Sequence, residues 1–309
     1  MDGVVNIYKP SGPTSFGVVQ SVKRILRVKK AGHIGTLDPM AEGVLPIGLN
    51  QTTRIIQFLT HLPKEYTACM ALGTITDTQD AAGKILETAD SSGIEEEQVR
   101  AALAGFVGEQ KQVPPMYSAK KKNGIPLYKL ARNGITIERK PVPIRIYSID
   151  FIKKTENHVT FRARCSAGTY IRTLCHDIGK KLGCGAHMVQ LTRNRVGNFD
   201  LQTSLTLEAL KTAKEGENLS DKICRMEDVL GFMPEVRVKR DQIKSITQGM
   251  PLPKSCVESF PDGLERGLSF RVCDGENGLV AIVESLIGQD EFGRMSPKDI
   301  AFKLKRVLV

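Results

Sequence analysis

The sequence predicts a mixed α+β protein with a mainly antiparallel sheet, followed by a small β-rich domain. Expected strands outnumber expected helices, and they are joined irregularly instead of in the β-α-β rhythm of parallel sheets. After residue 232 the pattern changes to short strands broken by Gly and Pro. We therefore divide the chain into residues 1–232 and 233–309, and 309 residues suffice for two such cores.

The first 60 residues predict a strand, a helix, a glycine-rich loop and a second short helix. Residues 3–9 read as a strand that ends at a Pro-Ser-Gly-Pro turn. Ser15 is the expected N-cap of the helix that follows, since Ser is a favoured capping residue. The loop occupies residues 32–48, and residues 52–59 read as the second helix.

The middle of the chain alternates between expected strands and helices. Residues 65–76 alternate as a strand, with Tyr66, Ala68, Met70 and Leu72 on one side. Ser92 and Glu95 form the expected capping box of a helix that extends to Phe106. A strand, a helix and a further strand are then predicted at residues 159–168, 169–183 and 188–199.

A long basic insertion is expected near residues 115–145. It is rich in Pro, Gly and Lys, and it surrounds one short helix that ends at Gly134. The segment from Pro115 to Arg195 holds 17 Lys/Arg and 4 Asp/Glu, so its net charge of +13 exceeds the +10 of the whole chain. A solvated basic face could explain such a segment, but charges that repel one another are better neutralised by a phosphate backbone. We therefore expect a nucleic acid partner.

Cysteine usage and hydropathy indicate a reduced, cytoplasmic protein that does not enter a membrane. The seven cysteines are odd in number and widely scattered, which does not suit a disulfide framework. A zinc site at Cys175, His176, Cys184 and His187 is not expected, because the set lacks a CxxC pair. No apolar run approaches the ~20 residues that cross a bilayer, and no signal or transit pattern opens the chain.

The loop GHIGTLDPMAEGVLPIG, residues 32–48, has one aspartate at its centre. Asp38 precedes Pro39, and the Asp-Pro pair often caps a helix. The loop contains no lysine, so it is not a phosphate-binding P-loop. Asp38 is therefore either a chemical group or a helix cap, and the loop alone leaves both open.

Three segments together closely resemble the tRNA pseudouridine-55 synthases of the TruB type. They are this loop with its G-x-L-D-P core, KEYTACMALGTITDTQDAAG, and SAGTYIRTLCHDIGKKLGCGAH. YKPSGPTS and VPPMYSAKKKNGIPLYKLAR fit as well, and the matches run in order over residues 3–200. The resemblance implies the pseudouridine synthase fold for residues 1–232 and a PUA-like RNA-binding domain for 233–309.

The resemblance also implies a reaction, in which uridine 55 of the tRNA T loop becomes pseudouridine. The partner would be the T-arm stem-loop of tRNA, with the target base flipped out of its stack. The reaction needs no redox change or energy source, so no metal or other cofactor is implied. We expect a monomer with no obligatory protein partner and no membrane association.

Asp38 is by resemblance the catalytic group, since breaking a glycosidic bond calls for a carboxylate. Arg172 would be its ion-pair partner, which would keep the carboxylate charged in a dry site. Tyr66 would stack on the uracil, and its hydroxyl would take the C5 proton. By pattern alone, a helix surface is the favoured position for Arg172, and Tyr66 could equally pack in the core.

The remaining expected site residues would bind the RNA. By resemblance, Tyr170 and Leu191 line the uracil pocket, and His33 fills the space that the flipped base leaves. Leu191 could otherwise be a core residue, and His33 an ordinary loop histidine. Lys120 and Lys121 of the basic insertion are expected to bind the substrate.

Three other functions are weighed against this one. A guide-RNA-dependent pseudouridine synthase would carry similar motifs, and a non-catalytic RNA-binding protein would need the insertion but not Asp38. A carboxylate hydrolase would need a second acid. We read Asp77 and Asp80 as turn residues, not as that acid or as a metal site.

Overall fold

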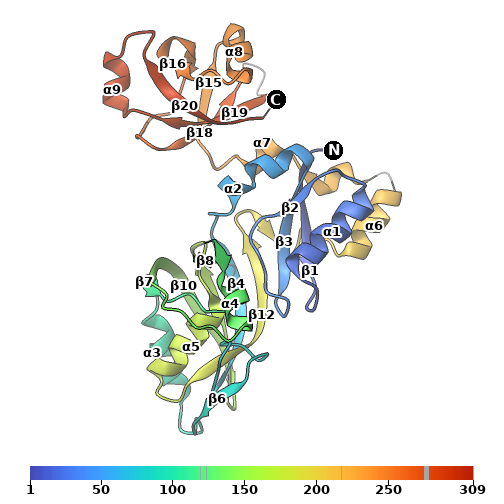
Figure 1. Cartoon of the computed structure of the whole chain (residues 1–309), viewed down its shortest axis with the longest axis vertical. Helices are drawn as coiled ribbons and strands as arrows, with labels where there is room; N and C mark the ends of the chain where they lie inside the picture. Colours follow the sequence, from blue (N-terminus) through green and yellow to red (C-terminus); the bar gives the residue numbers. More distant parts are fainter. Residues whose placement is uncertain (119, 123, 217, 275–277, 309) are drawn as a thin grey trace.

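The computed structural model describes the chain except for residues 119, 123, 217, 275–277 and 309, and two large sheets organise it (Figure 1). The larger sheet contains β1 (Gly3–Lys9), β2 (Ala31–His33), β3 (Glu42–Leu49), β4 (Lys64–Leu72), β7 (Gly108–Gln112), β10 (Val142–Thr155), β11 (His158–Cys165), β12 (Ala186–Val196), β13 (Phe199–Asp200) and β14 (Ile223–Cys224). Its order is β14-β1-β3-β12-β4-β11-β10-β7, with β2 on β3 and β13 on β12. Within the described residues, β12 and β3 form its one parallel pair. The predicted mixed, mainly antiparallel sheet is confirmed.

Two pairs of helices cover this sheet, at opposite ends (Figure 1). The α-helices before residue 232 are α1 (Ser15–Leu26), α2 (Ile56–Leu59), α3 (Glu96–Ala104), α4 (Leu127–Arg132), α5 (Ile171–Lys181), α6 (Leu207–Glu215) and α7 (Met226–Val229). The pair α1 and α6 packs on β1 and β3 in one apolar cluster, whereas α3 and α5 pack on β4, β10, β11 and β12 in another. In the described part of the chain, no helix is long and apolar enough to cross a membrane.

Two predicted helix caps differ from those observed. Thr14, not Ser15, is the N-cap of α1, and its Oγ1 accepts a hydrogen bond from the Gly17 amide at 3.0 Å. Ser15 is instead the first helical residue, and its hydroxyl turns inward. The capping box of α3 joins Glu95 to Gln98, because Ser92 lies in a turn that precedes the helix.

The second sheet lies entirely after residue 234 and has six strands. Its order is β16-β20-β19-β18-β15-β17, and the elements are β15 (Glu235–Val238), α8 (Ile243–Thr247), β16 (Leu252–Pro253), β17 (Val257–Ser259), β18 (Ser269–Cys273), β19 (Leu279–Ser285), α9 (Gln289–Arg294) and β20 (Ile300–Val307). One apolar cluster continues from the first sheet into the second, and it includes Leu59, Val229, Leu279 and Leu308. The predicted β-rich C-terminal region is therefore packed onto the first sheet through apolar contacts.

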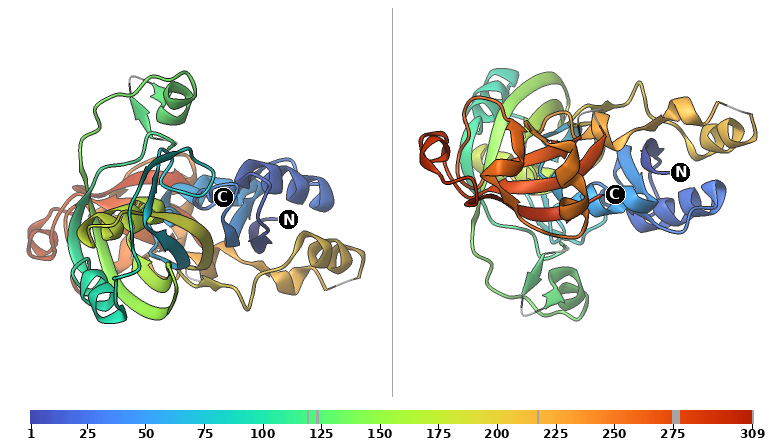
Figure 2. Two further views of the ribbon diagram at one scale, coloured as in Figure 1. Left: turned by 90° about the horizontal axis from the view of Figure 1, so that it is seen from below. Right: turned by 90° about the horizontal axis from the view of Figure 1, so that it is seen from above.

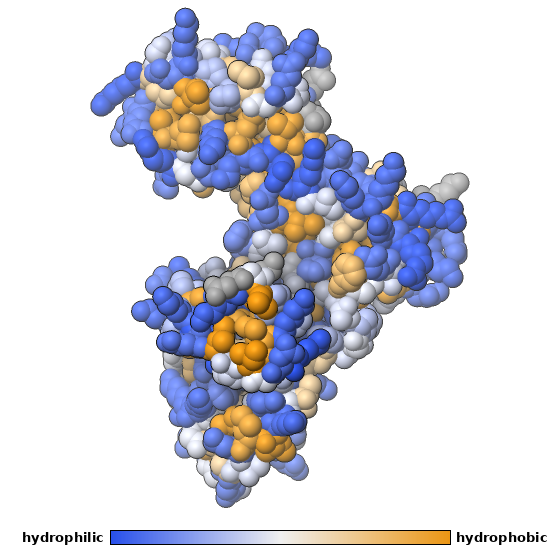
Figure 3. Space-filling view, viewed as in Figure 1, coloured by the Kyte–Doolittle hydropathy of each residue, from blue (hydrophilic) through white to orange (hydrophobic). Residues whose placement is uncertain are grey.

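The basic insertion projects from the edge of the first sheet as an arm, which we define as residues 113–141 (Figure 2). The arm contains the hairpin of β8 (Lys121–Lys122) and β9 (Ile125–Pro126), followed by α4. The predicted stop of α4 is confirmed, because the helix ends at Arg132 and Gly134 adopts a positive φ of 71°. Apolar side chains gather on the surface over β8 and α4 (Figure 3).

Candidate active site around Asp38

The Asp38 loop, residues 34–41, connects β2 to β3 and contains no helix. Asp38 and Ala41 close a turn in which the Ala41 amide donates to the Asp38 carbonyl at 3.1 Å. The helix-cap alternative for Asp38 is therefore wrong. The side chain of Asp38 is 36% exposed, so its carboxylate is accessible from outside the loop.

The side chains of two buried polar residues, Lys9 and Ser15, bind the backbone of this loop. Lys9 is fully buried, and its Nζ donates to the carbonyls of Pro39 at 3.0 Å and Ala41 at 2.6 Å. The Ser15 hydroxyl accepts from the Leu37 amide and lies 2.8 Å from the Leu37 carbonyl as well. Burial lowers the pKa of Lys9 to about 8, although the nearby Asp38 carboxylate opposes this shift. Buried side chains thus hold the backbone both before and after Asp38.

Arg172 forms the predicted ion pair with Asp38, and it also binds a second carboxylate. Its Nη2 lies 3.0 Å from Asp38 Oδ2, and its Nη1 donates to Asp80 Oδ2 at 3.2 Å. Nη2 also donates to the carbonyl of Tyr117 at 2.7 Å. Arg172 is only 6% exposed, so the alternative of a surface helix arginine is wrong.

Asp80 is a buried partner of Arg172, and reading it only as a turn residue is wrong. Its side chain is 6% exposed, and its Oδ1 accepts from the Thr78 hydroxyl at 2.6 Å and the Ala82 amide at 3.1 Å. These bonds occupy its oxygens, so Asp80 is not free to activate water as the second acid of a hydrolase would. Asp77 is a turn residue, as predicted, since it accepts the Lys84 amide at 2.8 Å.

The charges around Asp38 act on its pKa in opposite directions. Burial raises the pKa of the Asp38 carboxyl, Arg172 lowers it, and the negative charge of Asp80 raises it. Arg172 thus favours the ionised carboxylate, whereas Asp80 opposes it. The arrangement provides one accessible, oriented carboxylate beside one shared guanidinium.

Tyr66 and Leu191 lie on neighbouring strands and share a buried cluster with Leu37 of the Asp38 loop. Tyr66 is 9% exposed and Leu191 is 7% exposed, so both also serve as core residues. Burial raises the pKa of the Tyr66 phenol, and the phenol is therefore protonated near neutral pH. The structure therefore places Tyr66 and Leu191 in the same apolar cluster as Leu37, the residue before Asp38.

Tyr170 is the residue just before α5, two positions before Arg172, and the Gln112 side chain fixes its backbone. The Gln112 side chain accepts from the Tyr170 amide at 2.8 Å and donates to the Tyr170 carbonyl at 3.0 Å. The sequence did not indicate a role for Gln112, because no recognisable motif surrounds it.

His33, the last residue of β2, is half-buried, and burial lowers its pKa, which favours the neutral imidazole.

The two lysines predicted to bind substrate lie on the arm. Lys120 is exposed, whereas the Lys121 side chain lies outside the described part of the structure. The net charge of +13 overstates the surface charge of residues 115–195, because Arg172 and Arg193 are buried.

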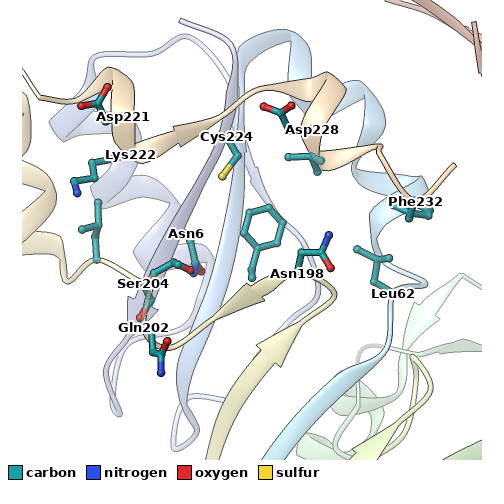
Figure 4. Close-up of a pocket in the computed structure, with 14 residues that line it drawn as sticks. Asn6, Leu62, Asn198, Gln202, Ser204, Asp221, Lys222, Cys224, Asp228 and Phe232 are labelled. Carbon is teal, nitrogen blue, oxygen red and sulfur yellow. The ribbon is translucent and has the colours of Figure 1, made fainter.

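A separate cavity of about 590 Å³ lies between β1, β13 and the segment around α7, and Figure 4 shows its lining. Asn6, Phe199 and Cys224 line it, but no predicted site residue does.

The described residues include no group of three or more His, Cys, Asp or Glu that could hold a metal ion.

Comparison with known proteins agrees with these motifs. Residues 23–171 match the TruB family pseudouridylate synthase N-terminal domain, and residues 172–230 match the tRNA pseudouridylate synthase B C-terminal domain. The tRNA pseudouridine synthase B of Clostridium tetani is 48% identical over 77% of this chain and 81% of its own. That of Syntrophus aciditrophicus is 40% identical over 99% and 98% of the two chains.

A solved structure is similar over nearly the whole chain. It is an H/ACA RNP bound to a substrate RNA containing 2′-deoxyuridine, with a TM-score of 0.78 and 31% identity over 99% of this chain and 85% of that one. The matched segments contain the Asp38 loop, β4 and α5, which together build the site. On this sequence and structural evidence, the chain belongs to the TruB family of pseudouridylate synthases.

Proposed function

We propose that this protein isomerises uridine 55 in the T loop of tRNA to pseudouridine without a cofactor. The N1–C1′ bond breaks, the detached uracil turns, C5 bonds to C1′, and the C5 proton is lost. The observation that carries the proposal is the accessible Asp38 carboxylate paired with buried Arg172 in a TruB-family loop. A carboxylate suits the sugar chemistry, either by attacking C1′ or by removing a sugar proton.

The substrate assignment draws on the relatives named tRNA pseudouridine synthase B, which are 40–48% identical to this chain. In this proposal Arg172 orients Asp38, while Tyr66, Tyr170 and Leu191 hold the uracil and His33 occupies the vacated stack. Lys120 and Lys121 of the arm bind the RNA backbone. Residues 1–232 form the catalytic domain, and residues 233–309 form a PUA-like RNA-binding domain. The protein acts in the cytoplasm as a monomer.

A guide-RNA-dependent synthase is the second candidate, because the similar solved structure is an H/ACA RNP. The lower identity of that chain, 31%, favours the tRNA enzyme.

The test is incubation of the pure protein with an unmodified T-arm stem-loop, with no other RNA or protein present. Derivatisation specific for pseudouridine should detect conversion of one uridine, in buffer containing EDTA. A stem-loop with cytidine at the target position should not react. Conversion only after addition of a guide RNA and partner proteins would support the second candidate, and binding without conversion under both conditions would refute both.

A further inference from the structure

Arg193 of β12 is the largest fully buried side chain in the described part of the structure, at 1% exposure. No carboxylate of the described residues lies within ion-pair distance of it, unlike Arg172. A buried cation without a counter-ion costs several kcal/mol unless hydrogen bonds compensate. The hydrogen bonds of the Arg193 guanidinium therefore indicate why this buried position holds an arginine.

The guanidinium of Arg193 ties the Asp38 loop to β3. Its Nε donates to the Val44 carbonyl at 2.7 Å, and its Nη2 and Nη1 donate to the carbonyls of Gly35 at 3.0 Å and Thr36 at 3.3 Å. The backbones of β3 and β12 can approach this closely because residue 43 is a glycine. A Cβ at that position would overlap the backbone of Arg193. A planar fork with five donors can hold three carbonyls at once, which an ammonium group cannot match in geometry.

Arg193 also lies directly opposite Tyr66 in the antiparallel β4–β12 pair, so their side chains share one face of the sheet. Burial raises the pKa of the Tyr66 phenol, and the positive charge of Arg193 acts against that rise. Arg193 therefore joins the Asp38 loop, which its guanidinium binds, to the strand pair that carries Tyr66.

We propose that Arg193 is a positioning residue that holds the Asp38 loop on β3 and β12, and so keeps the Asp38 carboxylate in a fixed place relative to Tyr66 on β4. This deepens the proposed function and rests on it, because the positioning would act on the chemical step of that reaction. A role as inert core filling would instead leave the chemical step unchanged in any variant that folds.

A conservative substitution separates the two roles. Arg193→Lys keeps the charge but loses the planar fork that binds three carbonyls. Arg195→Lys is the matched control, since Arg195 lies two residues away on β12 with a 55% exposed side chain. Single-turnover rates with excess enzyme, binding constants for the T-arm stem-loop and thermal unfolding are measured for each. Wild-type turnover on the same RNA tests the proposed function separately.

Arg193→Lys should lower the single-turnover rate at least about tenfold. Binding should change less than twofold, and Arg195→Lys should match the wild type. A wild-type rate in the folded Arg193→Lys variant, or a loss of binding as large as the loss of rate, would overturn the proposal. If the lysine variant unfolds, the same measurements are made on Arg193→Met at a temperature at which it is folded, and a wild-type rate there would also overturn the proposal.

Discussion

The Asp38 loop and the arm are both irregular in backbone, but they are held in different ways. Carbonyls on both sides of Asp38 accept hydrogen bonds from the cations of Lys9 and Arg193, whose side chains are fully buried. In the arm, by contrast, the side-chain bonds come from less buried groups, such as the exposed bond from Lys122 Nζ to the Glu138 carbonyl at 3.3 Å. The chemistry is therefore placed on a preorganised loop, whereas few side-chain hydrogen bonds hold the arm, so the arm can adjust to bound RNA.

One contact connects the two regions. Arg172, which holds Asp38, also donates to the carbonyl of Tyr117 at the base of the arm. Variants on the loop side should therefore change the chemical step, and variants at the tip of the arm should change binding.

The largest effect is expected at Asp38. Asp38→Asn should fold and bind tRNA nearly normally but lower the single-turnover rate by at least about a thousandfold, because an amide cannot replace the carboxylate. Asp77→Asn, in an exposed turn, is the control and should keep wild-type turnover. Substantial pseudouridine formation by the Asp38 variant would remove Asp38 from the mechanism.

A smaller loss is expected from Arg172→Lys. Lysine keeps the charge but loses the fork that now spans Asp38, Asp80 and the Tyr117 carbonyl. The chemical step should slow at least about tenfold, or ~1.4 kcal/mol of barrier, with little change in affinity. Single-turnover rates and binding constants check this, and a wild-type rate would contradict the orienting role.

The third prediction concerns Asp80 and the pH profile. The negative charge of Asp80 raises the pKa of Asp38, so Asp80→Asn should lower it. If Asp38 acts as a carboxylate, its rate falls as pH drops through that pKa, and the acid limb of the variant should move to lower pH. The plateau rate should fall about tenfold, because Arg172 loses a charged partner. An acid limb that stays in place or moves to higher pH would exclude this coupling.

The sequence predicted what depends on local pattern and motif, and it missed what depends on long-range placement. The 3.6-residue and two-residue periods identified α5 and β4, and the motifs identified Asp38 and Arg172. Asp80 looked like a turn residue, because its bond to Arg172 joins positions 92 residues apart. Lys9 ends an apolar strand as many surface lysines do, although GVVNIYK is buried on both faces and could have signalled a buried lysine.

The smallest effect on the chemical step is expected at the tip of the arm. Lys120 and Lys122 are exposed, and neither forms an ion pair with the described residues. If they lie against phosphates, each releases condensed counterions when RNA binds. Replacing both with alanine should therefore weaken binding at low salt and flatten the dependence of log K on log salt by about 1 to 2.

Saturating single-turnover rates should remain within about twofold of the wild type, because neither lysine touches the Asp38 loop. The matched control replaces Lys211 and Lys214, two exposed residues of α6. This helix packs beside α1, at the end of the first sheet opposite the arm (Figure 1). That pair removes the same net charge from the chain, so it measures the general effect of charge on tRNA binding. Equal slopes for the two double variants would mean that the arm lysines do not touch phosphate. A lower saturating rate for the arm variant alone would mean that the arm reaches the chemistry through Tyr117, and the division between preorganised loop and adaptable arm would no longer hold.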